Sequence, residues 1–208
     1  MKRPWLKPLA FLLCLLPALI LLGDGLTGNL GVNPVETITH TTGDWALRLL
    51  LITLAVTPAR RWLGWTWPAP LRRMLGLFSF FYVVLHFSTW FILDQGLSVP
   101  LMIADVIERP YITIGFIAFV LLIPLAATST NGMIKRLGGK RWKALHKAVY
   151  AIGVLGVLHF LWLVKADYIE PGIYALILAL LLMARLPASR ATRPTATPGS
   201  ASSSNGRA

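Results

Sequence analysis

The chain has 208 residues, of which 56% are hydrophobic and only 13% are charged, and its mean hydropathy is +0.66. This composition excludes an ordinary soluble domain and indicates a polytopic membrane protein. The single cysteine, Cys14, lies in an apolar run and can therefore support neither a disulfide framework nor a thiolate metal cluster. The formal net charge of +12 comes from short basic clusters between apolar segments, which indicates membrane topology and not nucleic-acid binding.

Six apolar segments predict membrane-spanning helices. In chain order they cover residues 9–22, 45–56, 74–93, 111–127, 143–165 and 172–183. The first is expected to be an uncleaved helix and not a signal peptide, because no small-residue cleavage site follows it. The second is too short to span unless its helix begins near residue 38 or 39, and Pro58 is expected to end it.

The connections between these segments differ in composition. Residues 23–43 are rich in Gly, Asn, Pro and Thr and predict an exposed loop. Residues 94–110 predict an amphipathic segment along the membrane surface, and residues 128–143 predict a basic loop with Asn-Gly and Gly-Gly turns. Residues 187–208 consist largely of Ala, Ser, Thr, Pro and Arg, which predicts a disordered cytoplasmic tail after a membrane domain of residues 1–186.

Charge is distributed unequally between the two sides of the predicted bundle. When the two ends and alternate loops are assigned to one side, 17 of the 20 basic residues fall there and all eight acidic residues fall on the other side. The positive-inside rule then places both termini in the cytoplasm. The predicted fold class is therefore an all-α integral membrane protein, a six-transmembrane-helix bundle with an acidic outer surface.

Two histidines inside the predicted spans are candidate metal ligands. His86 lies roughly 10 Å and His159 roughly 8 Å from the outer ends of their spans, at 1.5 Å per residue. Two imidazoles at matched depth on separate helices suit bis-histidine ligation of a haem, and Gly153 and Gly156 would make room for a flat ligand. Zinc suits the pattern less, because a tetrahedral site needs three or four ligands. The alternative is that each ring is only hydrogen-bonded to a neighbouring helix.

Three other residues carry weaker signals. His146 lies about 3 Å from the inner end of its span. It could ligate a second haem whose sixth ligand is absent or is not a histidine, with Met74 as the only sulfur candidate. It could instead serve a quinone or flavin site, or be an interfacial histidine among snorkelling cations. Arg48 follows Asp44 by one turn and either forms a local ion pair or neutralises a propionate of the outer haem. His40 is expected to be solvated or interfacial.

Several segments together resemble a known family. They are GVNPVETITHTTGDWALRLLLITLAVTP, RRMLGLFSFFYVVLHF, RPYITIGF, LAATSTNGMIKRLGGKRWKALHKAVY and VLHFLWLVK. Almost end to end over residues 5–186, these segments are similar to the MsrQ (YedZ) family of haem-binding membrane subunits in bacterial periplasmic methionine-sulfoxide reductase systems. This family belongs to the wider ferric-reductase-like transmembrane group. The combination of the LHF motif in the third span with the LH and LHF pair in the fifth makes this resemblance specific.

The resemblance implies cofactors, partners and a location. It matches His86, His146 and His159 to the family's haem-associated histidines, and it implies one or two haem b groups and FMN. Electrons would come from the quinone pool or a cytosolic flavin reductase, cross the bacterial inner membrane, and reach a periplasmic molybdopterin-containing catalytic subunit that reduces protein methionine sulfoxide. Catalysis would reside on that partner, so no catalytic residue is predicted in this chain.

A different class of function also fits the composition. The chain could be a transporter or an assembly factor whose intramembrane histidines relay protons or bind a metal ion. The two classes differ in absorption, because only a cytochrome has a Soret band that shifts on reduction.

Overall fold

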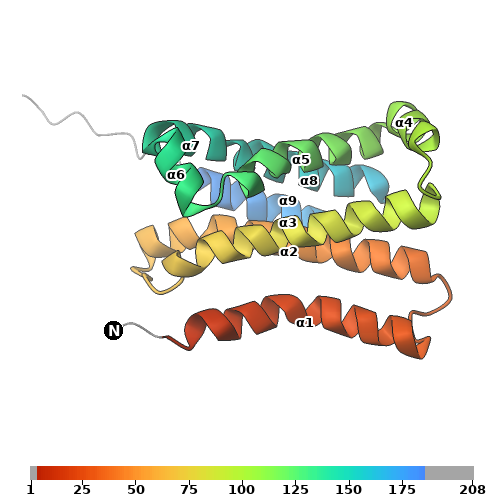
Figure 1. The fold of residues 1–208 in the computed structure, drawn as a ribbon, viewed down its shortest axis with the longest axis horizontal. Helices are drawn as coiled ribbons and strands as arrows, with labels where there is room; N and C mark the ends of the chain where they lie inside the picture. The colour runs from red at the N-terminus through yellow and green to blue at the C-terminus, as the bar shows by residue number, and fades with distance from the viewer. Residues whose placement is uncertain (1–3, 186–208) are drawn as a thin grey trace, which may run out of the picture.

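The computed structural model describes residues 4–185, and the regular structure of this part is helical throughout. The elements are α1 (Leu6–Thr27), α2 (Pro34–Trp62), η1 (Ala69–Leu71), α3 (Arg72–Thr89), η2 (Trp90–Asp94), α4 (Val99–Glu108), α5 (Pro110–Ala127), α6 (Asn131–Leu137), α7 (Gly139–His146), α8 (Ala148–Leu163) and α9 (Ile169–Met183). The predicted tail at 187–208 lies outside the described residues. The long helices run side by side as an elongated bundle, with α4 at one end and α6 and α7 at the other (Figure 1).

Four helical segments are long and apolar enough to cross a membrane, which confirms the prediction of an all-helical membrane protein. They are Leu6–Thr27, Ala69–Asp94, Pro110–Ala127 and Gly139–Leu163. Helix α9 is apolar but has only 15 residues. Helix α2 is long enough, with 29 residues, but it is the least apolar of the long helices because it carries several charged side chains.

Helix α2 is the centre of the bundle, which explains its mixed composition. Its side chains take part in all three buried apolar clusters of the described chain: Leu49 packs with α1 and α3, Leu47 with α8 and α9, and Leu50 with α5 and α8. A helix surrounded by protein can carry polar groups that lipid would exclude, because neighbouring helices provide partners for them.

Helix α2 begins earlier than the sequence predicted, so residues 34–43 are helical and not part of a loop. The Asn33 side chain caps the helix by accepting a hydrogen bond from the Glu36 amide at 3.3 Å, and Pro34 takes the first helical position, where no amide hydrogen is needed. The prediction of an exposed loop over 23–43 is therefore wrong except for the short connection between α1 and α2.

The same helix also continues past Pro58, where it was expected to end. Proline lacks the amide hydrogen that would bond the carbonyl of Leu54 four residues earlier. The Arg185 guanidinium, at the end of α9, donates to that carbonyl instead, and it also donates to the Tyr150 hydroxyl at 2.7 Å. The carbonyl that Pro58 leaves without its usual donor is thus satisfied by a residue that follows α9, and α2 continues to Trp62.

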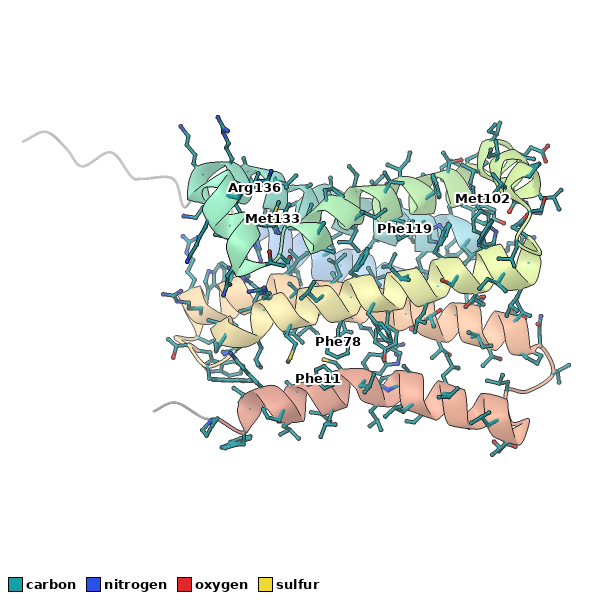
Figure 2. All side chains as sticks on the ribbon, in the orientation of Figure 1. Phe11, Phe78, Met102, Phe119, Met133 and Arg136 are labelled. Carbon is teal, nitrogen blue, oxygen red and sulfur yellow. The ribbon has the colours of Figure 1, made fainter. Side chains whose placement is uncertain are left out.

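The basic connection and the fifth predicted span also differ from expectation. Residues 128–143 are not a simple loop, because α6 and most of α7 lie there. The span predicted over 143–165 is not one continuous helix, because a turn at Lys147 separates α7 from α8. Arg136 and Met133 of α6 lie at the end of the bundle opposite Met102 of α4 (Figure 2).

Helix α1 is held to α3 by Tyr82 of α3, whose hydroxyl forms hydrogen bonds with two backbone groups of α1. The Tyr82 hydroxyl donates to the Cys14 carbonyl at 2.8 Å and accepts from the Ala18 amide at 3.1 Å, so it lies between two groups that would otherwise bond each other. Phe11 of α1 and Phe78 of α3 pack edge to face nearby, with ring centroids 5.1 Å apart (Figure 2). Tyr82 is fully buried.

The Tyr82→Phe variant is expected to loosen α1. Loss of a buried hydrogen-bonded hydroxyl costs about 1 kcal/mol, which corresponds to roughly fivefold more frequent opening of the helix contact. Cys14 is the single cysteine of the chain and is buried by this contact, so its labelling rate with N-ethylmaleimide reports the opening. Tyr168→Phe, at an exposed position, is the control. Equal labelling rates in both variants would contradict the role of the hydroxyl.

Candidate functional site

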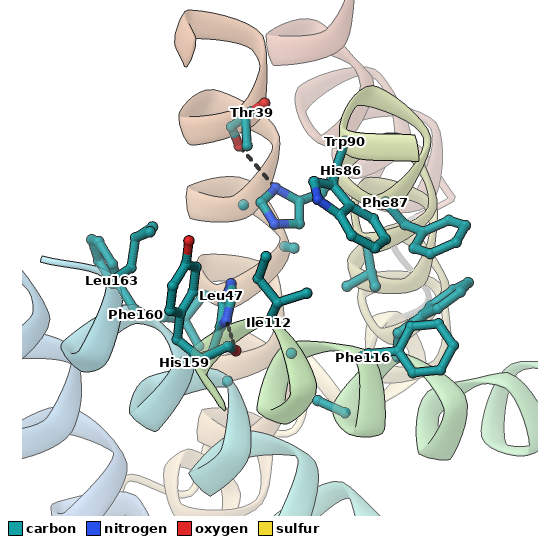
Figure 3. Close-up of a pocket in the computed structure, with 18 of the residues that line it drawn as sticks. Thr39, Leu47, His86, Phe87, Trp90, Ile112, Phe116, His159, Phe160 and Leu163 are labelled. Atoms are coloured by element: carbon teal, nitrogen blue, oxygen red, sulfur yellow. Dashed lines mark hydrogen bonds between the residues drawn. The ribbon is translucent and has the colours of Figure 1, made fainter. Parts of the chain in front are cut away.

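Two histidine rings face each other inside the bundle. His86 comes from α3 and His159 from α8, and their ring centroids are 6.1 Å apart with the ring planes at 82° (Figure 3). Both line a cavity of about 510 Å³ between α2, α3, α5 and α8, in the half of the bundle near α4. The structure thus brings together the two rings that the depth argument paired.

Each ring is oriented by a backbone carbonyl. His86 Nδ1 lies 2.9 Å from the Thr39 carbonyl oxygen, and His159 Nδ1 lies 2.7 Å from the Tyr111 carbonyl oxygen. A carbonyl oxygen only accepts, so in both rings Nδ1 carries the hydrogen and donates it. The Nε2 lone pair of each neutral imidazole is then available to a metal, and a hydrogen bond at the other nitrogen is the usual support for a metal-bound histidine.

A glycine lies beside each ring, one helical turn after the carbonyl that orients it. Gly43 follows Thr39 by four residues in α2, and a Cβ at Gly43 would lie 3.1 Å from the His86 ring. Gly115 follows Tyr111 by four residues in α5, and a Cβ there would lie 2.8 Å from His159 Nδ1. The same arrangement of carbonyl, glycine and histidine therefore occurs twice, once on each side of the cavity.

The cavity walls are mainly apolar and aromatic. Phe87 of α3 stacks on Phe119 of α5 with centroids 4.7 Å apart, and Phe116 lies beside them (Figure 3). Gly156 lines the cavity as predicted, but Gly153 does not, because a Cβ there would meet the Leu178 side chain of α9 at 3.2 Å. Volume and lining are those of a cofactor or small-molecule site, which typically occupies about 300–1,000 Å³ and has few polar groups.

Polar side chains gather on the cavity lining toward α4. They are His40, Asp44, Asp94, Gln95 and Arg109. The His40 side chain is half exposed and lies 3.9 Å from a Glu36 carboxylate oxygen, so it is both solvated, as predicted, and part of the lining. Arg109 pairs with Asp105 through Nε at 2.8 Å.

Arg48 lies outside the cavity lining. Its guanidinium donates to the Tyr174 hydroxyl at 2.7 Å, to Asp44 at 3.2 Å and to Glu170 at 3.2 Å. The local ion pair with Asp44 is thus present, and a second carboxylate from α9 completes it. With these partners, Arg48 ties α2 to α9, and it is not among the side chains that line the cavity with the two histidines.

His146 is separate from the other two histidines, at the end of α7. Its ring stacks on Trp142 with centroids 3.9 Å apart, and Nδ1 lies 3.1 Å from the Trp142 carbonyl oxygen. Nε2 is buried and has no hydrogen-bond partner within residues 4–185. Met74, the sulfur candidate for this site, packs instead in the apolar cluster of α1, α2 and α3.

Sequence reasoning missed the groups that orient the two rings. The acceptors on Thr39 and Tyr111 are backbone carbonyls, which no residue type reveals. Gly43 and Gly115 were visible as glycines inside or beside apolar segments, and such glycines indicate a close approach by another group. In the part of the chain that the structure describes, no three His, Cys, Asp or Glu side chains gather as a metal site.

The bundle and its facing histidines define a membrane protein of the ferric-reductase-like class. The family model described as "Ferric reductase like transmembrane component" matches residues 42–157, which include His86 and His146 and end two residues before His159. Curated relatives match almost the whole chain, and no solved structure matches it.

Three examples of these relatives follow, each with the name "Protein-methionine-sulfoxide reductase heme-binding subunit MsrQ". The protein from Herminiimonas arsenicoxydans is 54% identical over 183 residues, 87% of this chain and 84% of its own length. The protein from Rhodospirillum rubrum is 52% identical over 90% of this chain and 91% of its own length. The protein from Deinococcus radiodurans is 49% identical over 93% and 98%. The chain belongs to the MsrQ family.

Proposed function

We propose that this chain is a b-type cytochrome subunit that carries electrons across a membrane to a partner that reduces protein methionine sulfoxide. The observation that carries the proposal is the facing pair of His86 and His159. Metal–imidazole bonds are about 2.0–2.1 Å long, so two imidazoles that share one iron would have ring centroids roughly 6 Å apart. The distance between the two centroids in this protein is 6.1 Å.

The residues around the cavity fit a haem. His86 and His159 would hold the iron through Nε2, while the Thr39 and Tyr111 carbonyls keep Nδ1 protonated and the rings in place. Apolar and aromatic walls would bury the flat ring and exclude water. A haem bound in this way supplies one-electron transfer. The relatives' names, which describe a haem-binding subunit, support the assignment.

The membrane topology is part of the proposal. Helices α2 and α9 would complete a six-span bundle in the inner membrane, with both termini in the cytoplasm. The first described residues and the end of α9 lie at the same end of the bundle as α6 and α7 (Figure 1), whose lysines and arginines the positive-inside rule assigns to the cytoplasm. The His86–His159 cavity would then lie near the periplasmic face, where an extracytoplasmic acceptor would take electrons. The membrane domain would comprise residues 1–186.

His146 is proposed as the cytoplasmic cofactor site where electrons enter. A buried Nε2 without a partner is costly unless a ligand completes it, and the stacked Trp142 forms a flat wall beside it. A second haem or FMN would suit this position, with the quinone pool or a cytosolic flavin reductase as the donor. The acceptor would be a periplasmic molybdopterin-containing catalytic subunit, for which the acidic outer loops offer an electrostatic docking surface.

An absorption spectrum of the purified full-length protein tests the function. We expect a Soret band that sharpens and shifts when dithionite reduces the protein, with a low-spin spectrum because His86 and His159 would both hold the iron. A preparation that binds no haem, in a folded helical state, would exclude the cytochrome and leave the transporter or assembly-factor function. Haem and flavin counted per chain in the same sample would measure the stoichiometry.

A further inference from the structure

A buried carboxylate organises the α4 side of the cavity. Asp105, on α4, is only 8% exposed. Its Oδ2 accepts hydrogen bonds from Trp90 Nε1 at 3.1 Å and Gln95 Nε2 at 3.0 Å, and its Oδ1 lies 2.8 Å from Arg109 Nε. Trp90, Gln95 and Arg109 all line the cavity. One carboxylate therefore fixes three side chains at the cavity, and they in turn satisfy its charge.

An unusual helical turn places two of these partners. Directly after α3, residues Trp90–Asp94 form a π-helix, a form that is rare and occurs frequently at functional sites. The Gln95 amide donates to the Trp90 carbonyl at 3.0 Å and closes this wide turn. Trp90 and Gln95, which directly continue the helix that carries His86, thereby both reach the Asp105 carboxylate of α4.

Arg109 is the permanently positive side chain in the cavity lining. The other charged residues there are Asp44 and Asp94, which are negative, and His40 is neutral unless protonated. A guanidinium has five N–H donors. The contacts with Asp105 and with the Tyr111 hydroxyl, the latter at 3.4 Å, use two of them. The remaining donors are available to an anion, because the Arg109 side chain is more than half exposed and is one of the residues that line the cavity.

A haem has two carboxylates that an apolar cavity cannot bury without a partner. Arg48 is unsuitable because Asp44 and Glu170 already occupy its guanidinium outside the lining. We propose that Arg109 pairs with a haem propionate at the α4 side of the cavity and that Asp105 is the positioning residue that holds Arg109 there. This assignment rests on the proposed haem site and adds the residues that select its orientation.

Reconstitution of the full-length apoprotein with two ligands tests the proposal. The ligands are haem b and haem b dimethyl ester, in which both carboxylates are methylated. For Arg109→Gln we expect roughly tenfold weaker binding of haem b, because a charge-assisted hydrogen bond is lost. Binding of the dimethyl ester should not change. Arg48→Gln, which removes a cation outside the lining, is the matched control and should leave both affinities unchanged.

The positioning role of Asp105 has its own variant. Asp105→Asn keeps the size of the side chain and can still accept from Trp90, but it no longer pairs with the Arg109 charge. We expect it to weaken haem b binding in the same direction as Arg109→Gln and to leave ester binding unchanged. In the double variant the two effects should not add, because Asp105 acts through Arg109.

Three results would overturn the proposal. Equal losses for haem b and its ester in Arg109→Gln would show that Arg109 acts on the fold and not on a carboxylate. Selective loss in Arg48→Gln would assign the propionate to Arg48. If the wild-type chain and Arg109→Gln bind haem b with the same affinity, Arg109 has no part in binding. A wild-type chain that binds neither ligand removes the proposed function itself, and this inference with it.

Discussion

His86→Ala and His159→Ala will each remove the haem from the cavity while the protein still inserts and folds. Each variant would delete one of the two proposed haem ligands, and haem binding is expected to fall by more than about tenfold, since even the loss of a supporting hydrogen bond costs roughly 10- to 100-fold. The measurement is haem per chain, from the Soret absorbance of the purified variant. Full haem content in either variant would exclude the pair as the ligands.

The matched control is His146→Ala, which removes a histidine of the same chain at the other end of the bundle. It should keep the low-spin spectrum of the His86–His159 site and lose only cofactor bound near Trp142. Added imidazole provides a second check, because it can enter the space left in His86→Ala and restore low-spin absorbance. If His146→Ala alone loses all haem, the assignment of the two ends is wrong.

Gly115→Ala will reduce haem binding although it adds only one methyl group. The new Cβ would lie 2.8 Å from His159 Nδ1, a distance that real Cβ atoms do not show, so the ring must leave the Tyr111 carbonyl that orients it. We expect haem affinity to fall roughly 10- to 100-fold, as for loss of a supporting hydrogen bond. Alanine favours a helix over glycine by about 1 kcal/mol, so the apoprotein should be no less stable to heat.

Two other glycine-to-alanine variants provide the comparison for Gly115→Ala. Gly43→Ala would place its Cβ 3.1 Å from the His86 ring, so a smaller loss is expected, because the ring needs to move by only a few tenths of an ångström. Gly76→Ala on α3 would meet Thr53 at an ordinary 3.7 Å and should leave haem binding unchanged. Equal haem content in the Gly115 and Gly76 variants would show that the His159 contact is not needed for binding.

Helix periodicity and charge were enough to predict the all-helical membrane fold. Counting 1.5 Å per residue also paired His86 with His159, because depth along a helix depends only on sequence position. The ends of α2 could not be predicted in this way. Where it passes Pro58, the free carbonyl of Leu54 accepts from Arg185, 131 positions later, and a partner so distant in the chain leaves no local signal.

The surroundings of the histidines were harder to predict than the histidines. Gly43 was assigned to a loop, because the Asn33 cap that starts α2 lies among residues typical of turns. Arg109 belonged to a segment predicted to lie on the membrane surface. Its place at the cavity depends on the buried Asp105 and on the π-helical turn, neither of which has a periodicity that the sequence displays.

The use of carbonyl groups to orient both rings has a consequence for how this protein can vary. Thr39 and Tyr111 hold the histidines through the main chain, so almost any side chain at these two positions would serve equally well as the acceptor. The restriction on residue type falls instead on Gly43 and Gly115, where a Cβ atom would come too close to a histidine ring. In a screen of all single substitutions, the strongest intolerance outside the histidines should therefore appear at two residues with no side chain.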